Sequence, residues 1–397
     1  MSDRLSVGIV GGGIGGLAAA LSLLQRGFDV QVYEQAQEFG EVGAGIQVSP
    51  NASRILHRLG LADALARMGV RPLAWRQRRW DDGRTLLHTP LGDTVVEAFG
   101  FPHYQTHRAD LLATLVRSLP PDRLHVGHRL VSFADDGDRV SLEFETGSTV
   151  EADALVGADG IHSTVQRLLL GEQRPRFTGC IAYRGLIPAE RVADLRIPVE
   201  AQVWMGPGRH FVHYYVQEER LLNWVALVEH DTWQRESWTD RGEVADALAA
   251  YEGWHPQIRR IVESVDETFV WALFDRAPLE RWSSGRVTLL GDACHPMLPF
   301  MAQGAAQAIE DGAALAACLA GTPDVEAAFR RYEAVRLPRA SKIQSLSAQN
   351  KVRFHLPDGP DQEERDRRMA TRSTDWSIEA VAWIYGHDAG IVDDAAD

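Results

Sequence analysis

The sequence predicts an α/β fold in which a β-α-β nucleotide-binding unit is joined to an antiparallel sheet. An apolar strand at 6–10, a glycine-rich turn, a helix at about 15–26 and a second strand at 30–34 indicate the unit. Alternating stretches rich in aromatic and β-branched residues indicate the sheet, at 178–186, 199–205, 209–216 and 220–229. Because nucleotide-binding motifs lie on both sides of these stretches, we expect the sheet to be inserted into a discontinuous domain.

Local patterns predict the remaining elements. Helical periodicity indicates helices at 51–70, with Asn51 as a plausible cap, and at 107–118, 241–264 and 325–355. Asp/Gly turns separate three predicted strands at 124–132, 138–146 and 148–156. A short apolar segment follows at 378–385.

The glycine-rich turn has the spacing G-x-G-x-x-G at Gly11, Gly13 and Gly16. Glycine allows the tight turn, the approach of the backbone to a pyrophosphate and the packing of the helix on the strand. Glu34 ends the second strand, 21 residues after Gly13 (34 − 13). Its carboxylate suits the ribose hydroxyls of an adenosine, and its charge disfavours a 2′-phosphate. The turn therefore predicts FAD or NAD rather than NADP.

Two further strands end in a glycine–aspartate pair and lead to a helix. The strand at 287–290 stops at Gly291 and Asp292, and a helix of small residues begins at about Gln303. Another strand ends at Asp159, with Ser163 near the cap of the next helix. A carboxylate can accept hydrogen bonds from a polyhydroxylated chain, and a helix amino end attracts anionic oxygen. Taken by itself, the segment at Asp159 is explained equally well by an ordinary capped strand–helix turn and by a ligand-binding turn.

The composition excludes several classes of protein. The chain of 397 residues is long enough for two joined domains, and its net charge of −14 disfavours nucleic acid and anionic membranes as partners. The three cysteines form no CxxC pair, and Cys294 and His295 lack partners for a metal site, so we expect no metal. Without a leader or a membrane-length apolar run, the simplest expectation is a cytoplasmic protein.

Taken together, the three motifs resemble those of the single-component (group A) FAD-dependent aromatic hydroxylases, from Val7 to about Tyr385. The resemblance implies a Rossmann-like FAD-binding domain of the glutathione-reductase type over 1–75, 105–175 and 275–325. It places an antiparallel substrate domain at 76–104 and 176–274, and a C-terminal helical segment at 326–397. It further implies an NAD(P)H-dependent enzyme, with NADH preferred, that transfers oxygen from O2 through a flavin C4a-hydroperoxide. Its partners would be O2 and a small aromatic acid, and the enzyme a monomer or homodimer.

The resemblance also implies which residues hold FAD. Arg108 matches an arginine that touches the cofactor, although a solvated helix residue is the simpler alternative. Gln303 and Gly304 would lie beside the flavin ring, and Ala302 stands where many members have glycine. The implied set is Gly11, Gly13, Ile14, Gly15, Gly16, Glu34, Gly45, Arg108, Leu130, Asp159, Asp292, Gln303, Gly304 and Ala305.

The candidate catalytic pair is His210 and Tyr214. Because alternate residues of a strand share a face, these two point one way, while His213 and Tyr215 point the other. A phenol is a weak nucleophile until it is deprotonated, so the histidine could act as base and the tyrosine as orienting donor. The His-x-x-x-Tyr pattern resembles that of 3-hydroxybenzoate and 6-hydroxynicotinate hydroxylases. On pattern alone, the two are better interpreted as ordinary sheet residues, and it is the resemblance that favours a role in the site.

The predicted substrate contacts are Gln47 and the loop of Pro299, Phe300 and Met301. Pro299 is more like salicylate hydroxylases than 3-hydroxybenzoate 6-hydroxylases, which tend to have Gln there. Ala201 stands where 6-hydroxynicotinate enzymes tend to have Cys. We therefore expect salicylate, converted to catechol with loss of CO2. The alternatives are 3-hydroxybenzoate, giving gentisate, and a related N-heteroaromatic acid.

Two other classes of protein remain open at this point. An FAD oxidase or dehydrogenase would use the same cofactor fold, and incorporation of labelled O2 distinguishes it from a monooxygenase. A non-catalytic flavin- or NAD-binding regulator is disfavoured because the chain carries both cofactor clamps and a polar pocket pair. A purified protein without yellow colour would favour it again.

Overall fold

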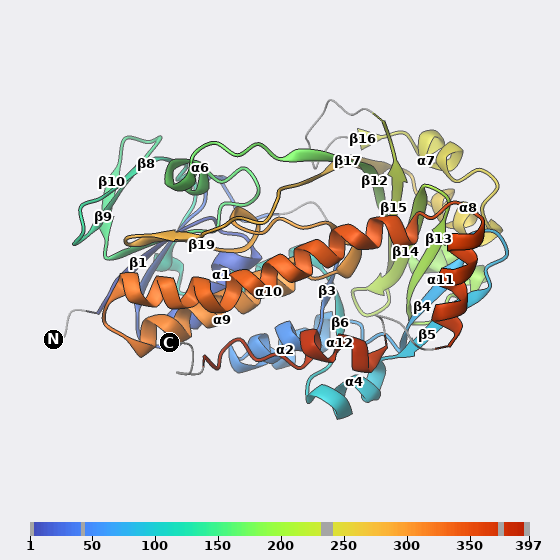
Figure 1. The fold of residues 1–397 in the computed structure, drawn as a ribbon, viewed down its shortest axis with the longest axis horizontal. Helices are drawn as coiled ribbons and strands as arrows, with labels where there is room; N and C mark the ends of the chain where they lie inside the picture. Colours follow the sequence, from blue (N-terminus) through green and yellow to red (C-terminus); the bar gives the residue numbers. More distant parts are fainter. Residues whose placement is uncertain (1–3, 41–43, 232–240, 372–376, 393–397) are drawn as a thin grey trace.

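The computed structural model describes residues 4–40, 44–231, 241–371 and 377–392. Figure 1 shows a nucleotide-binding half on the left, a second sheet on the right, and the long helix α10 (Val325–Phe354) running between them. At about 1.5 Å per residue, 30 residues make a rod of about 45 Å. This helix is long enough to reach from one half to the other.

The nucleotide-binding half is built on a six-stranded sheet in the order β18-β19-β11-β1-β2-β7. All neighbouring strands in it are parallel except for the β18–β19 pair. The carboxyl ends of its parallel strands therefore share one edge. The strands are β1 (Ser6–Val10), β2 (Asp29–Tyr33), β7 (Leu124–His125), β11 (Ala154–Gly157), β18 (Ser283–Ser284) and β19 (Val287–Leu289).

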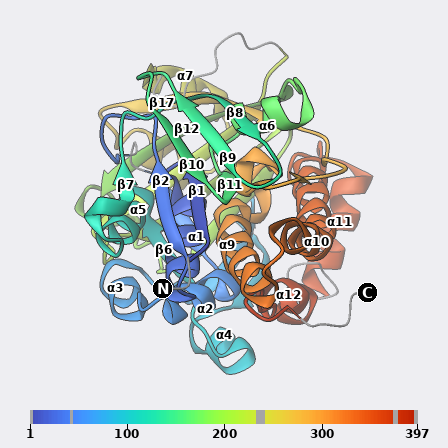
Figure 2. The same ribbon diagram turned by 90° about the vertical axis from the view of Figure 1, so that its left-hand side faces the viewer.

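Helices α1 (Ile14–Gln25) and α9 (Gly304–Gly321) pack closely because glycine lies at both contact points. A Cβ placed on Gly15 would lie 2.9 Å from the Cβ of Ala308, and one on Gly312 would lie 2.8 Å from the Cα of Ala19. Because the contacts advance by four residues along both helices, α1 and α9 run parallel and begin on the same side. Figure 2 shows α1, α9 and α10 side by side in that order.

Buried ion pairs join α10 to α9. Arg336 donates from Nε to Asp311, 2.7 Å away, and from Nη1 to Glu310, 2.5 Å away. All three side chains are fully buried. Burial opposes the charge of each carboxylate, but electrostatic attraction more than compensates, from Arg336 and Arg339 at Glu310 and from His295 and Arg336 at Asp311. The pKa values of both acids therefore fall to about 2. Both acids are therefore ionised in the neutral-pH protein.

The second half is an eight-stranded sheet in the order β16-β17-β12-β15-β14-β13-β4-β5. Only the β4–β13 pair is parallel. Two separate stretches of chain supply its strands, in agreement with an inserted sheet. They are β4 (Ala74–Arg79), β5 (Thr85–Pro90), β12 (Arg176–Pro188), β13 (Ala201–Gly206), β14 (Arg209–Val216), β15 (Leu221–Glu229), β16 (Arg241–Gly242) and β17 (Thr268–Asp275).

Smaller elements complete the fold. Strand β3 (Gly45–Val48) pairs with β6 (Tyr104–His107), and β8 (Leu130–Asp135), β9 (Val140–Phe144) and β10 (Thr149–Ala152) form a three-stranded sheet. The other helices are α2 (Pro50–Arg58), α3 (Ala62–Met68), α4 (Gly92–Phe99), α5 (Arg108–Arg117), α6 (Thr164–Leu170), α7 (Val244–Ala250), α8 (Pro256–Val262), α11 (Pro360–Ala370) and α12 (Ile378–Tyr385). Among the described residues, no helix is both long and apolar enough to span a bilayer.

Two predicted helices are interrupted. The helix expected at 51–70 divides into α2 and α3, because Gly60 adopts a left-handed φ of +84° between them. The cap of α2 is Ser49, so Asn51 lies inside the helix and not at its start. The helix expected at 241–264 begins as strand β16 and then divides into α7 and α8 around Gly253, whose φ is +78°.

Candidate active site

Four sequence motifs follow four adjacent strands of the six-stranded sheet. The glycine turn follows β1, Glu34 follows β2, Asp159 follows β11 and Asp292 follows β19. The crevice at the carboxyl ends of parallel strands is the usual ligand site of such sheets. A cavity of about 180 Å³ opens there. The predicted residues that line it are Gly11, Gly13, Glu34, Leu130 and Asp159, and the others are Val10, Tyr33, Gln35, His128, Arg129, Ala158, Gly160 and Thr164.

The glycines of the turn differ in what surrounds them. A Cβ on Gly11, whose φ is +114°, would lie 2.2 Å from the carbonyl oxygen of Ala158, and one on Gly16 would lie 2.1 Å from that of Gly11. A Cβ on Gly13 would meet no described atom within 4 Å. The protein itself therefore requires the first and third glycines, while the second leaves open space at the start of α1. The first amides of a helix lack intrahelical acceptors, so this space suits a pyrophosphate.

The carboxylate of Glu34 is held in place by backbone amides. Oε2 accepts a hydrogen bond from the amide of Gly12 at 2.7 Å, and Oε1 accepts one from that of Ala36 at 2.8 Å. Each carboxylate oxygen has a further lone pair. Glu34 can therefore accept two ribose hydroxyls without moving.

The side chain of Asp159 serves the turn that contains it. It accepts hydrogen bonds from the Ser163 hydroxyl and from the Thr164 amide at 2.7 Å, while Ser163 caps α6 through the Gln166 amide at 2.8 Å. Burial raises the pKa of Asp159, and these hydrogen bonds oppose the rise. The side chain of Asp159 therefore stabilises a capped turn, and the same turn also lines the cavity.

Asp292 is exposed at the edge of the site. Its carboxylate is nevertheless surrounded by enough protein for desolvation to raise its pKa, an effect that His295 and Arg108 partly offset. Arg108 begins α5, directly after β6. The Asp292 carboxylate and the Arg108 guanidinium, which are far apart in the sequence, are therefore close enough in the fold to interact electrostatically.

The start of α9 offers backbone rather than side-chain donors. Gln303 is buried and turns its side chain towards α2, donating to Ser49 Oγ at 2.9 Å and accepting from Asn51 Nδ2 at 3.1 Å. The amides of Gly304 and Ala305 remain without intrahelical acceptors. Just before them, Ala302 has a left-handed φ of +51°, which explains why glycine suits this position.

His210 and Tyr214 lie on one face of β14, and both are buried. The imidazole of His210 lies 5.0 Å from the ring of Phe300, between centroids. A Cβ on Gly45 would lie 2.7 Å from the hydroxyl of Tyr214, so this side chain reaches β3. Burial lowers the pKa of His210 well below its ordinary value and raises that of Tyr214. His213 points to the opposite face, where it accepts from Trp204 Nε1 at 3.1 Å.

Of the predicted substrate contacts, Gln47, Phe300 and Met301 are buried and Pro299 is exposed. Gln47 Oε1 lies 3.1 Å from His103 Nε2. Burial lowers the pKa of His103 to about 3, so this neutral imidazole is the donor to Gln47.

One face of α10 holds the backbone of the loop that was predicted to contact the substrate. Three side chains spaced three residues apart donate to alternate carbonyl oxygens: Gln344 to Pro296 at 2.9 Å, Ser347 to Leu298 at 2.5 Å and Asn350 to Phe300 at 3.4 Å. All three side chains are buried. The long helix therefore fixes the loop that carries Phe300 and Met301.

The structure also reveals a partner for His210 that the sequence did not indicate. Its Nδ1 lies 2.7 Å from Nε2 of His355, which follows α10, and Nδ1 of His355 lies 3.0 Å from Oε1 of Glu229. Because 145 residues separate the two histidines, no local pattern could have predicted the contact.

Asp311 supplies the third group that Cys294 and His295 lacked in sequence, and the possible ligand atoms of the three lie within 4.8 Å of one another. However, Asp311 already accepts hydrogen bonds from the Gly291 amide, His295 and Arg336. The positive charge of Arg336 beside the carboxylate opposes a cation. The cluster is therefore best described as part of the buried ion-pair network.

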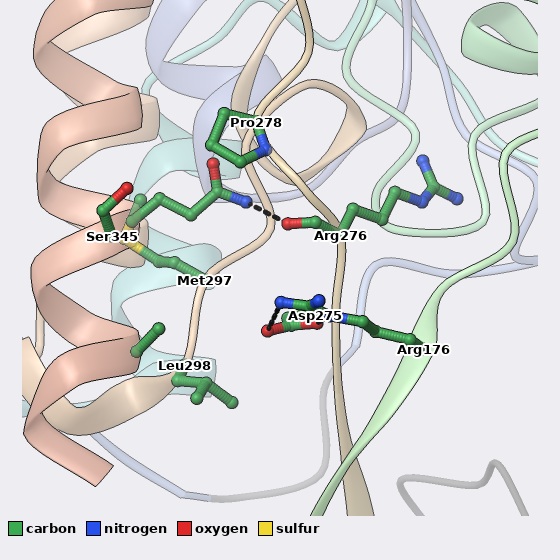
Figure 3. A pocket seen from close by; sticks show the side chains of 9 residues that line it. Arg176, Asp275, Arg276, Pro278, Met297, Leu298 and Ser345 are labelled. Carbon is green, nitrogen blue, oxygen red and sulfur yellow. Dashed lines mark hydrogen bonds and ion pairs between the residues drawn. The ribbon is translucent and has the colours of Figure 1, made fainter. Parts of the chain in front are cut away.

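A second cavity, of about 90 Å³, lies beside α10. Arg176 and Asp275 are paired at one side of it, and the side chain of Arg276 leads away from it (Figure 3). The Arg276 guanidinium instead donates to Gln166 Oε1 at 3.0 Å and to the Ile161 carbonyl, and thereby joins β17 to the Asp159 turn. The cavity is lined by Arg176, Asp275, Arg276, Pro278, Met297, Leu298, Gln344, Ser345 and Ala348.

A family model described as an FAD binding domain matches residues 4–347. The chain belongs to this FAD-binding family. As its relatives show, it is an FAD-dependent aromatic-ring monooxygenase, and NAD(P)H is the electron donor typical of the family. The open space at Gly13, the fixed Glu34 carboxylate and the strand-edge cavity fit FAD. When bound, FAD supplies the redox chemistry with O2 that protein side chains cannot provide.

The flavoprotein is similar to curated enzymes along almost its whole length. It is 42% identical over 393 residues to 3-amino-4-hydroxybenzoate 2-monooxygenase PtmB3 of Streptomyces platensis, covering 98% of each chain. It is 42% identical to 6-hydroxynicotinate 3-monooxygenase of Pseudomonas fluorescens, covering 88% of this chain and 92% of the relative. It is 34% identical to 3-hydroxybenzoate 6-hydroxylase of Klebsiella oxytoca, covering 95% and 96%.

Solved structures of similar proteins confirm the predicted α/β flavoprotein fold. Klebsiella pneumoniae HpxO, complexed with FAD and uric acid, has a TM-score of 0.87 and 27% identity, covering 97% of each chain. A salicylate hydroxylase substrate complex has a TM-score of 0.83 and 26% identity, covering 100% of each chain. The predicted resemblance to group A aromatic hydroxylases is therefore confirmed.

Proposed function

We propose that this monooxygenase hydroxylates an aromatic acid whose ring hydroxyl lies para to its carboxylate, with 3-amino-4-hydroxybenzoate as the leading candidate. The two relatives at 42% identity are named for 3-amino-4-hydroxybenzoate and 6-hydroxynicotinate, which share this arrangement. Ala201 favours the benzoate over the nicotinate, as argued from the sequence. Salicylate and 3-hydroxybenzoate, whose hydroxyls are ortho and meta, become the second candidates.

The observation that carries the proposal is the placement of His210 and Tyr214. They share a buried face of β14, next to Phe300 of the loop and to Gly45, which belongs to the implied FAD set. A neutral imidazole whose pKa is lowered by burial can accept a phenolic proton, and a tyrosine whose pKa is raised stays protonated and can donate to the resulting phenolate. The pair therefore suits activation of a ring hydroxyl.

The overall reaction balances as one ring C–H, one O2, one NAD(P)H and one proton giving one ring C–OH, one NAD(P)+ and one water. The residues of the chain bind and orient the ring, hold its phenolic proton and exclude water with Phe300 and Met301, which are buried. Gln47 and His103 are polar groups that we assign to the other end of the ring.

The test is a screen of 3-amino-4-hydroxybenzoate, 6-hydroxynicotinate, 3-hydroxybenzoate and salicylate, following NADH oxidation, hydrogen peroxide and product mass under labelled O2. We expect coupled incorporation of one oxygen atom with 3-amino-4-hydroxybenzoate. Coupled turnover of salicylate alone would overturn the para assignment. Peroxide without labelled product from any acid would favour an oxidase.

Variants test the two site residues. We expect His210→Ala to keep FAD bound and to lower coupled turnover by about 10² or more. Tyr214→Phe should increase uncoupled peroxide formation. Its matched control is Tyr215→Phe on the opposite face of the same strand, where the hydroxyl donates a long hydrogen bond of 3.4 Å to the Ile197 carbonyl. Unchanged coupled turnover in His210→Ala would contradict the base assignment.

A further inference from the structure

We propose that His355 and Glu229 form a proton relay that connects His210, in the candidate active site, to solvent. The proposal rests on the proposed function of His210 as the base. His355 is the first residue after α10, and its ring lies against β14 and β15. The three groups form a continuous chain, with 2.7 Å between the two imidazoles and 3.0 Å between His355 and the Glu229 carboxylate.

The exposure of the three side chains changes along this chain. His210 is 1% exposed, the His355 side chain is 1% exposed and the Glu229 side chain is 46% exposed. The relay therefore begins in the interior and ends at the surface. A proton can travel it without opening a water channel to the substrate.

The carboxylate of Glu229 determines which nitrogens carry protons. An ionised carboxylate only accepts, so Nδ1 of His355 is the donor to it. In neutral His355, Nε2 is then the acceptor, and Nδ1 of His210 must donate to it. Nε2 of His210 is consequently unprotonated. This tautomer is the one that a base requires.

The transfer balances without a further reactant. The phenolic proton of the substrate moves to Nε2 of His210, and the Nδ1 proton of His210 moves to Nε2 of His355. The result is a phenolate in the pocket and an imidazolium at His355 beside Glu229. The reverse transfer returns the proton to the oxygen of the product.

The surroundings favour the charge on His355 over His210. The imidazole of His210 lies between Phe300 and Phe354, with ring centroids 5.0 and 5.1 Å away, and burial lowers its pKa. Burial also lowers the pKa of His355, but the hydrogen bond and charge of Glu229 oppose this effect. Two cations face His355 as well and disfavour its protonation, namely Lys351 of α10 and Arg209 of β14.

Both cations have neutral partners of their own. Lys351 Nζ donates to the Thr178 carbonyl at 2.6 Å, and Arg209 donates to the Ala250 carbonyl. Hydrogen bonds also hold the backbone of both histidines in place. The Gly208 amide donates to the His355 carbonyl at 3.0 Å, and the Tyr251 hydroxyl donates to the His210 carbonyl at 2.7 Å. The relay geometry is therefore held independently of the proton positions.

The experiment compares Glu229→Gln, His355→Gln and His210→Ala with the parent enzyme, all with bound FAD. The first readout is the absorbance change of 3-amino-4-hydroxybenzoate on binding, which reports its ionisation to phenolate, from pH 5.5 to 9. The second is the pH profile of coupled turnover. We expect Glu229→Gln to raise the apparent pKa of the bound phenol by about one unit and to slow turnover about tenfold at pH 7.

We expect His355→Gln, which keeps hydrogen-bonding atoms but cannot carry the proton, to lose phenolate formation below pH 8. Glu263→Gln is the matched control, because this exposed carboxylate pairs only with Arg259 of its own helix among the described residues. FAD content and melting temperature identify any variant that misfolds. Because the Glu229 side chain is half-exposed, Glu229→Gln still tests the relay if the variant of the buried His355 fails to fold.

The outcomes separate the relay from the base assignment. If His210→Ala abolishes phenolate formation while both relay variants match the parent at every pH, the relay is wrong and the base assignment stands. If all three variants match the parent, the proposed role of His210 fails as well. Should 3-amino-4-hydroxybenzoate not bind, the same comparison uses whichever acid of the screen is turned over.

Discussion

Ser347, in the C-terminal third of α10, donates a hydrogen bond to the carbonyl oxygen of Leu298, 2.5 Å away. The contact joins the long helix to the loop that carries Phe300, and Ser347 is fully buried. Ser347 therefore helps to fix the backbone of this loop from α10.

We predict that Ser347→Ala destabilises the protein by about 1 kcal/mol and increases the share of NADH consumed as hydrogen peroxide. The reason is that the Leu298 carbonyl loses its buried donor and the loop packs less well over the ring. Ser345→Ala is the control, because Ser345 is exposed and, within the described part of the chain, its hydroxyl bonds only to Ser341 of its own helix. Peroxide yields that are equal in the two variants would contradict the prediction.

The two glycines Gly13 and Gly16 should respond oppositely to alanine. Gly13→Ala should fold and gain about 0.5 kcal/mol, because Gly13 has an ordinary φ of −75° and its Cβ would point into open space. Its FAD affinity should fall at least tenfold, since the Cβ occupies the space assigned to the pyrophosphate. Thermal unfolding of the apoprotein and flavin fluorescence titration measure both effects.

Gly16→Ala provides the contrast. Its Cβ would lie 2.1 Å from the Gly11 carbonyl oxygen, so this variant should lose folding as well as FAD. A Gly13→Ala protein that binds FAD as tightly as the parent would show that the pyrophosphate lies elsewhere.

Glu34→Ala should weaken FAD binding by about 10-fold to 100-fold, the effect of one or two lost hydrogen bonds to a charged group. The carboxylate is already oriented by the Gly12 and Ala36 amides, so its loss removes a preformed acceptor. Glu38→Ala, an exposed carboxylate nearby, is the control. Dissociation constants from fluorescence quenching decide the matter, and equal values for both variants would exclude a role for Glu34.

Acid should destabilise the fold in two stages. Burial lowers the pKa values of His103 and His213 from 6.5 to about 3. Arg336 and Arg339 lower the pKa of Glu310 from 4.5 to about 2, and His295 and Arg336 lower that of Asp311 from 3.8 to about 2. The unfolded chain therefore binds more protons below pH 6.5, and stability falls as the pH falls. Each histidine should cost about 2 kcal/mol between pH 6.5 and 5.

The carboxylates add to this loss between about pH 4.5 and 2. Urea unfolding at pH 7.5, 6 and 5 measures the first stage, and acid unfolding followed by tryptophan fluorescence measures the second. A free energy of unfolding that stays constant from pH 7.5 to 5 would show that the two histidines are not buried as neutral groups.

The cofactor edge could be predicted from the sequence because its signals are local. The glycine spacing around Gly13 and the carboxylate of Glu34 are set by one β-α-β unit, and the structure places both at the same cavity. The face shared by His210 and Tyr214 was predictable for the same reason, since strand alternation is local. Which side chains share a strand face does not depend on distant parts of the chain.

The details that could not be predicted depend on contacts between distant segments. The side chain of Gln303 bonds to Ser49, the cap of α2, and to Asn51 inside α2, both about 250 residues earlier in the chain. The pairing of His210 with His355 depends on where a 30-residue helix ends. Substrate identity is harder still, because Pro299 alone favoured salicylate, whereas the similar enzymes are named for acids whose hydroxyls lie para, meta or ortho to the carboxylate.

The double insertion of the eight-stranded sheet has a mechanical consequence. The chain enters this sheet once through β4 and β5 and again from β12 to β17, and α10 fastens it a further time through the loop at Leu298. A body tethered at several points cannot swing on a single hinge as a lid does. Relative movement of the two halves is therefore resisted at each of these connections, and not at one hinge alone.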